Sequence, residues 1–236
     1  SLLTSFFTWE IPDPVVYVYS QWISAGSLSV PFALQVDNLA MLLSVVITGI
    51  CLIALLYSAY NYPDRKSLPR LLSLVCFTNS AMLLVVLAAN FPLMLVGWVS
   101  VTIGTAMLTG FDFRNPVSLP AARTIFIQNM VSDIALLVAV ILLTTSPLAL
   151  TQDGIGIHLD FVSIFGRIRN LIDTDPAHIT GMLPVINAIV LLIFIGAAGK
   201  SSQLFFNTWL PASSNAPGPA YLSLIHISEP TRLRRI

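Results

Sequence analysis

The sequence contains few charged residues. Only 9% of its 236 residues are charged, with 11 acidic side chains against 11 basic ones, whereas soluble domains carry roughly a quarter. Hydrophobic residues make up 56% of the chain. This composition is typical of an integral membrane protein. Because the formal net charge is zero and no basic run is present, nothing indicates nucleic acid as a partner.

Sequence motifs for redox chemistry are also missing. The two cysteines, Cys51 and Cys76, lie in apolar runs, where cysteine is expected to act as a small hydrophobic side chain. The sequence has no cysteine cluster, no Gly-rich nucleotide loop and no paired membrane histidines for haem. We therefore expect the chain to bind no cofactor and no metal, so that any oxidoreductase activity would belong to a larger assembly.

The two ends of the chain look atypical. The sequence starts at Ser1 without a methionine or a cleavable leader, which indicates an internal fragment. Residues 222–232 look like a translated sequencing adapter of the transposase type, so we expect residues 222–236 to be an artefact outside the fold. His226 lies in this stretch and is not counted as a partner of any other residue.

Long uncharged segments predict an all-α fold, a polytopic transmembrane helix bundle. One spanning helix takes about 20 apolar residues, so the segments suffice for about five complete spans. We expect residues 1–36, rich in proline and aromatics, to form a partial helix and an outer-side loop, and residues 37–219 to form the bundle. The expected spans are 38–63, 71–89, 92–111, 120–143 and 182–200.

The connections between these spans differ in charge. The connection around residues 64–70 is basic, whereas residues 144–181 are net acidic and include a predicted surface helix at 159–172. Basic connections tend to remain in the cytoplasm, which places the acidic connection on the outer side. The expected location is a lipid bilayer, the inner (cytoplasmic) membrane of a bacterium.

Lys200 ends an otherwise uncharged apolar segment. A cation in hydrocarbon is costly and usually faces a polar cavity or a partner; the alternative is a lysine that extends to the membrane surface. The polar residues Ser201, Ser202 and Gln203 follow directly, and polar, irregular backbone at membrane depth is tolerated only inside protein or beside water. We therefore predict Lys200 as a proton-transfer residue and these three residues as channel lining.

A second polar group lies in the segment 120–143. Gln128, Ser132 and Asp133 project from one side of a helix and are expected to line the same channel. Asp133 is predicted to transfer protons with Lys200, the alternative being a structural hydrogen-bond acceptor. Asp37 precedes the first span, where a carboxylate is expected to act as a structural cap of the helix.

Several motifs carry a family resemblance. The strongest is Gly-Lys-Ser-Ser-Gln-Leu at 199–204 with Thr-Trp-Leu at 208–210, and weaker ones lie at 36–39, 91–98 and 129–133. Over about residues 20–219 the chain resembles the proton-conducting antiporter-like membrane subunits, most closely the largest such subunit of respiratory complex I. The resemblance implies part of a bundle of roughly fourteen helices, in which Lys200 would be the proton-carrying lysine on a broken helix.

Three positions depart from the family pattern. Val99 stands where a glutamate follows the Gly-Trp pair, Met130 where arginine is common, and Leu55 where histidine is frequent. A buried lysine needs a counter-charge to stay protonated. Asp133 is therefore the predicted replacement for the missing glutamate.

The functional hypothesis is a membrane subunit that translocates protons within an NADH:quinone oxidoreductase, with other membrane subunits as partners. One alternative is a membrane subunit of an inorganic-carbon uptake complex or of a multisubunit cation/proton antiporter. Another is a structural subunit that conducts no ions. No catalytic residue is expected in this chain, and the sequence leaves open which ion is moved.

Overall fold

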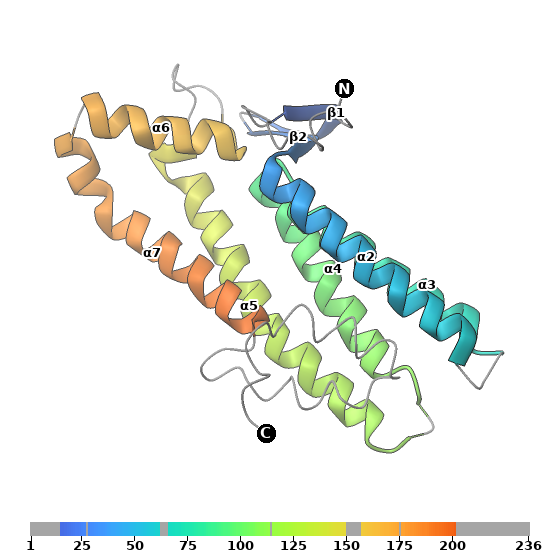
Figure 1. Ribbon diagram of the computed structural model, residues 1–236. Helices are drawn as coiled ribbons and strands as arrows, with labels where there is room; N and C mark the ends of the chain where they lie inside the picture. The colour runs from blue at the N-terminus through green and yellow to red at the C-terminus, as the bar shows by residue number, and fades with distance from the viewer. Residues whose placement is uncertain are drawn as a thin grey trace, which may run out of the picture.

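The computed structural model describes residues 15–26, 28–61, 66–113, 115–149, 157–174 and 176–201. The predicted tail at 222–236 and the first fourteen residues lie outside this part. Within it the chain is mostly helical, with one small sheet at one end of the helices (Figure 1). The elements are β1 (Val15–Ala25), β2 (Leu28–Val36), α2 (Asn38–Asn61), α3 (Leu68–Leu87), α4 (Phe91–Thr109), α5 (Ser118–Thr145), the short 3₁₀ helix η1 (Pro147–Ala149), α6 (Phe161–Thr174) and α7 (Pro176–Lys200).

Five of the described helices are long and apolar enough to cross a membrane, namely α2, α3, α4, α5 and α7. They alternate in direction along the bundle, while α6 lies across its end as expected of a surface helix (Figure 1). The predicted transmembrane helix bundle is thus confirmed, and the small sheet is the departure from the all-α prediction. The largest shift in a helix start is in α7, which begins at Pro176 and includes Pro184 in its interior, whereas its apolar spanning part begins at Gly181.

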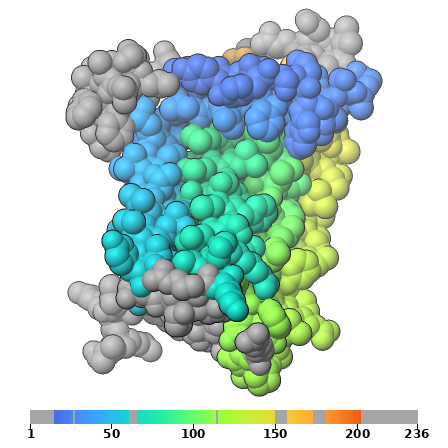
Figure 2. Space-filling model, turned by 90° about the vertical axis from the view of Figure 1, so that its right-hand side faces the viewer, coloured from blue at the N-terminus to red at the C-terminus, as the bar shows by residue number. Residues whose placement is uncertain are grey.

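The segment 15–36 differs from the predicted outer-side loop, because it forms an antiparallel β-hairpin. Its β-branched and aromatic residues favour a strand; Gly26 makes the turn with φ of 59°. Pro31 on β2 pairs with Gln21, next to a register shift, a place where a strand tolerates proline. Figure 2 shows this hairpin as a blue band across the ends of the helices.

Asn90 joins the hairpin to the helices at this end. Its Oδ1 accepts a hydrogen bond from the backbone N–H of Leu93 at 2.9 Å, which caps the start of α4, and its Nδ2 donates to the carbonyl of Pro31 at 2.8 Å. Backbone hydrogen bonds from Ala89 to Ala33 and from Phe161 to Ala89 extend the same junction. The hairpin, the turn between α3 and α4, and the start of α6 therefore form one connected end.

Replacing Asn90 separates its two roles. Asn90→Ala should lower the free energy of unfolding of the full-length protein by about 1–2 kcal/mol, because a cap and a buried hydrogen bond are both lost. Asn90→Asp keeps the acceptor for Leu93 but removes the donor to Pro31. Amide hydrogen exchange should then accelerate in β2 while the start of α4 stays protected. Equal acceleration in both elements would contradict this assignment.

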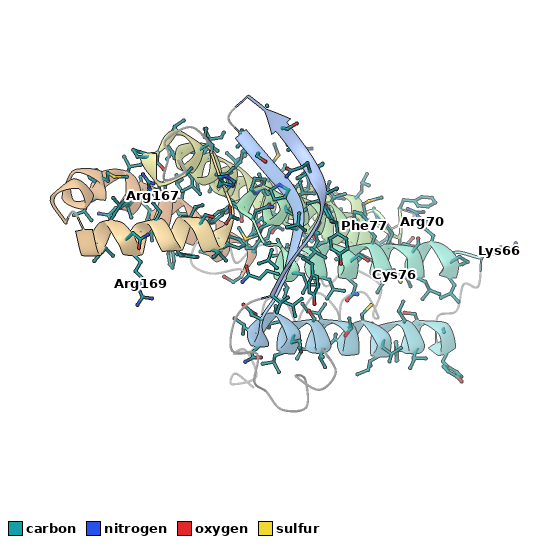
Figure 3. The ribbon with its side chains drawn as sticks, turned by 90° about the horizontal axis from the view of Figure 1, so that it is seen from above. Lys66, Arg70, Cys76, Phe77, Arg167 and Arg169 are labelled. Atoms are coloured by element: carbon teal, nitrogen blue, oxygen red, sulfur yellow. The ribbon has the colours of Figure 1, made fainter. Side chains whose placement is uncertain are left out.

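The opposite end of the bundle carries basic residues. Lys66 and Arg70 lie at the start of α3, away from the hairpin (Figure 3), and the Arg70 guanidinium lies 5.1 Å from the centre of the Phe111 ring. Ser118 at the start of α5 donates a hydrogen bond to the carbonyl of Thr109 at 2.8 Å. Lys66 and Arg70 thus give the end away from the hairpin basic side chains, as predicted for the connection around residues 64–70.

Two buried apolar clusters hold the elements together. One joins α2, α3 and α4 near the basic end and contains Leu71 and Leu108. The other joins the hairpin, α5, α6 and α7, with Ile164 supplied by the inner face of α6, whereas Arg169 projects outward from that helix (Figure 3). Between the clusters, at mid-bundle, lies the polar group described next.

Candidate proton-transfer site

Lys200 is the last residue of α7, and its ammonium group meets a carboxylate inside the bundle. Lys200 Nζ lies 2.9 Å from Asp133 Oδ1 on α5, and the two side chains are only 13% and 10% exposed. Asp133 follows the start of α5 by fifteen residues and precedes its end by twelve, or about 22 and 18 Å along a helix axis. The ion pair therefore lies near mid-span, which rules out a lysine that reaches the membrane surface.

Thr102 on α4 completes this site and is not among the residues predicted from the sequence. Its Oγ1 donates a hydrogen bond to Asp133 Oδ2 at 2.6 Å and accepts one from Lys200 Nζ. The side chain is 1% exposed. A signal was present, because Thr102, Thr105 and Thr109 recur on one face of α4. Three helices thus each contribute one side chain to the site.

Small residues bring α7 close enough to α5 for this contact. Ser132 Oγ donates a hydrogen bond to the carbonyl of Gly196, and a Cβ added at Gly199 would lie 2.7 Å from the Cβ of Ser132. Small residues at helix contacts allow such close backbone approach. Ser132, which is predicted to line the channel, is fully buried in the contact between the two helices. Because Ser132 directly precedes Asp133, its hydrogen bond to Gly196 also keeps Asp133 close to the end of α7.

A cavity of about 410 Å³ adjoins the ion pair, with Lys200 and Ser201 in its wall. Its lining is mainly apolar side chains of α2 and α3, with Thr78 and Asn79 as polar exceptions. Trp98 also lines it, and Lys200 Nζ lies 5.8 Å from the centre of the Trp98 ring. The cavity has room for several water molecules, and Asn79, Lys200 and Ser201 are polar groups in its wall that could bind them.

The other predicted residues are not all part of the site. Gln128 is partly buried on α5, five residues before Asp133, and is not in the cavity wall. Asp37 Oδ1 accepts a hydrogen bond from the backbone N–H of Ala40 at 2.6 Å, the geometry of a helix cap. Ser202 and Gln203 lie outside the described residues.

Of the three positions that depart from the family pattern, Val99 and Met130 are 38% and 46% exposed. Leu55 packs against the apolar cluster at the basic end.

The chain matches two known family models. A family model described as "NADH:quinone oxidoreductase/Mrp antiporter, TM" matches residues 88–226, more than half of the chain. The chain belongs to this family. A second model, "NADH-Ubiquinone oxidoreductase (complex I), chain 5 N-terminus", matches residues 22–62. The resemblance seen in the sequence is confirmed, and the chain is part of an integral membrane protein.

Individual relatives of this antiporter family cover most of the chain. It is 30% identical over 212 residues to NADH-ubiquinone oxidoreductase chain 5 of Phytophthora infestans, covering 90% of this chain and 30% of that protein. It is 33% identical over 208 residues to NADH-quinone oxidoreductase subunit L of Mycobacterium tuberculosis, covering 87% and 29%. The chain therefore spans less than a third of the length of these relatives.

A solved structure shares the fold. A chain in the Mrp complex from Dietzia sp. DQ12-45-1b aligns with a TM-score of 0.71 at 23% identity, covering 94% of this chain and 22% of that chain. At this identity the likeness concerns the arrangement of the elements alone.

Proposed function

We propose that this chain is part of a membrane subunit that translocates protons within an NADH:quinone oxidoreductase. The observation that carries the proposal is the buried contact between Lys200 and Asp133 near mid-span. Ionisable residues at this depth are costly and usually mark the path of an ion. Membership of the antiporter family supports the same conclusion.

The chemistry follows from the cost of burying charge. While Asp133 touches Lys200, the carboxylate compensates the ammonium charge, and the pair is tolerated in a poorly hydrated environment. When the two groups separate, an unpaired ammonium becomes expensive, so the lysine gives its proton to an acceptor such as water. Closing of the pair favours uptake of the next proton. Opening and closing of one ion pair can thus load and release one proton.

We further propose other membrane subunits as the partners and the cytoplasmic membrane of a bacterium as the location, with the basic end of the bundle facing the cytoplasm. The charge difference between the ends supports this orientation, and bacterial relatives support the location. Electron transfer would take place in other subunits.

A second candidate is a membrane subunit of a multisubunit cation/proton antiporter or of an inorganic-carbon uptake complex. The description of the matching family model names the Mrp antiporter beside the oxidoreductase, which favours the antiporter. Mass spectrometry of the subunits that co-purify with the full-length protein separates the two candidates. Soluble redox subunits would support the oxidoreductase. Antiporter or carbon-uptake subunits in their place would support the second candidate.

Lys200→Arg tests whether Lys200 carries protons. Arginine keeps the positive charge for Asp133 but does not release its proton in proteins. We expect coupled proton uptake into vesicles containing the complete assembly to fall on the order of a hundredfold, the scale on which loss of a proton-transfer group slows acid–base steps.

The amount of assembled protein should stay close to that of the unsubstituted assembly, since the ion pair is kept. Uptake at the unsubstituted rate would contradict a proton-carrying role and would leave Lys200 as a structural cation in a subunit that conducts no protons by this route.

A further inference from the structure

Thr102 differs from the other buried threonines at the end of α4 in where its hydroxyl group is directed. Thr105 Oγ1 donates to the carbonyl of Thr102 at 2.9 Å and Thr109 Oγ1 donates to that of Thr105 at 3.0 Å. Such bonds to the preceding turn of the same helix are the usual way for a helical threonine to satisfy its hydroxyl. Thr102 Oγ1 instead donates across to α5, to Asp133 Oδ2 at 2.6 Å.

The contacts of Thr102 close a ring around the ion pair. Asp133 uses Oδ1 for Lys200 and Oδ2 for Thr102, and Lys200 Nζ donates to the oxygen of the same threonine. A hydroxyl can donate and accept at once, so a neutral side chain connects both charged groups. Because Thr102 is fully buried, water does not readily replace it.

This arrangement has a consequence for the open state of the pair. When Lys200 leaves, a carboxylate without any partner would be strongly disfavoured in the bundle. The hydrogen bond from Thr102 stays with Asp133 at that moment, because it reaches the other carboxylate oxygen. Thr102 therefore lowers the penalty of separating the charges and keeps Asp133 oriented for the return of Lys200.

We propose that Thr102 is the positioning residue of the proton-transfer site, which holds the Asp133 carboxylate while Lys200 exchanges its proton. This inference rests on the proposed function of Lys200. The helix α4 contains no acidic or basic side chain. Its contribution to the site is therefore the neutral hydroxyl group of Thr102.

A series at position 102 tests the proposal in the complete assembly. Thr102→Val removes the hydroxyl at nearly constant size, Thr102→Ser keeps it, and Thr102→Cys offers a weaker donor. Thr105→Val is the matched control, because it removes an equally buried hydroxyl of α4 that bonds only within its own helix. We expect proton uptake to fall about tenfold or more in Thr102→Val, the scale of one hydrogen bond to a charged group.

Thr102→Ser should stay close to the unsubstituted rate, Thr102→Cys should be intermediate, and Thr105→Val should change little. The infrared carboxylate band that disappears in Asp133→Asn should move in Thr102→Val and Thr102→Cys but not in Thr105→Val. If Thr102→Val fails to assemble, the position of the carboxylate band and the rate of proton uptake in Thr102→Cys still test the proposal. Uptake and band position in the Thr102 variants equal to those in Thr105→Val would overturn the proposal.

Lys200→Arg, measured in the same vesicles, separates this result from the proposed function. If Lys200→Arg loses uptake while the Thr102 series does not, only the role of Thr102 is wrong. If Lys200→Arg retains uptake, the proton-carrying role of the pair is wrong, and the proposed role of Thr102 is then wrong as well.

Discussion

Asp133→Leu is expected to destabilise the protein by about 3–5 kcal/mol, because it leaves the Lys200 ammonium buried without its counter-charge. Removal of one partner of a buried pair is far more damaging than removal of both. Thr102 would lose its acceptor on α5 at the same time. Thermal or denaturant unfolding of the full-length protein in detergent measures the loss, and proton uptake in vesicles should stop.

The double variant Asp133→Leu with Lys200→Met is the control for this prediction. It replaces both charges with apolar side chains of similar size, which is often neutral or stabilising for a buried pair. Stability should return while proton uptake stays absent. A single variant that unfolds like the unsubstituted protein would show that Asp133 is not the charge partner of Lys200.

Gly199→Leu is expected to force α7 away from α5 and to abolish proton uptake. A Cβ at this position would lie 2.7 Å from the Cβ of Ser132, so the larger side chain cannot be accommodated without moving a helix. Overpacking of this kind costs about 1–3 kcal/mol, and the displaced residue is the direct neighbour of Lys200. Proton uptake and unfolding in detergent measure the two effects.

Gly181→Leu is the matched control on the same helix, because nothing lies within 4 Å of a Cβ added there. Leucine favours helix more than glycine does, so this variant should be at least as stable as the unsubstituted protein. A milder substitution sharpens the test: Gly199→Ala should impair uptake less than Gly199→Leu does. Equal behaviour of Gly199→Leu and Gly181→Leu would contradict the close contact between α5 and α7.

The existence of the spans could be predicted because it depends mainly on composition, whereas the start of α7 at Pro176 could not. Uncharged runs separated by charged or turn-forming residues gave five spanning helices, and the Asn-Phe-Pro at 90–92 was read correctly as the start of one of them. The hairpin could not be predicted from the sequence, because a proline such as Pro31 is more typical of a loop than of a strand. Its tolerance depends on the register shift in the hairpin, which is a property of pairing and not of either strand alone.

Within the site, the residues that could be predicted from the sequence are those whose charge is energetically costly to bury. A lysine in an apolar segment needs a counter-charge, and Asp133 is the acidic residue that lies within a predicted span. Thr102 carries no charge and is common inside helices, so its importance appears only once α4, α5 and α7 are packed together. The contact of Ser132 with α7 could not be predicted either, because it depends on the close approach of the two helices at Gly196 and Gly199.

The position of the ion pair near mid-span also has an electrical meaning. A proton that reaches Lys200 from either side has crossed about half of the membrane potential, which corresponds to about 1 kcal/mol for each 100 mV. Loading Lys200 from one side and emptying it to the other would therefore divide the work against the potential into two steps of similar size.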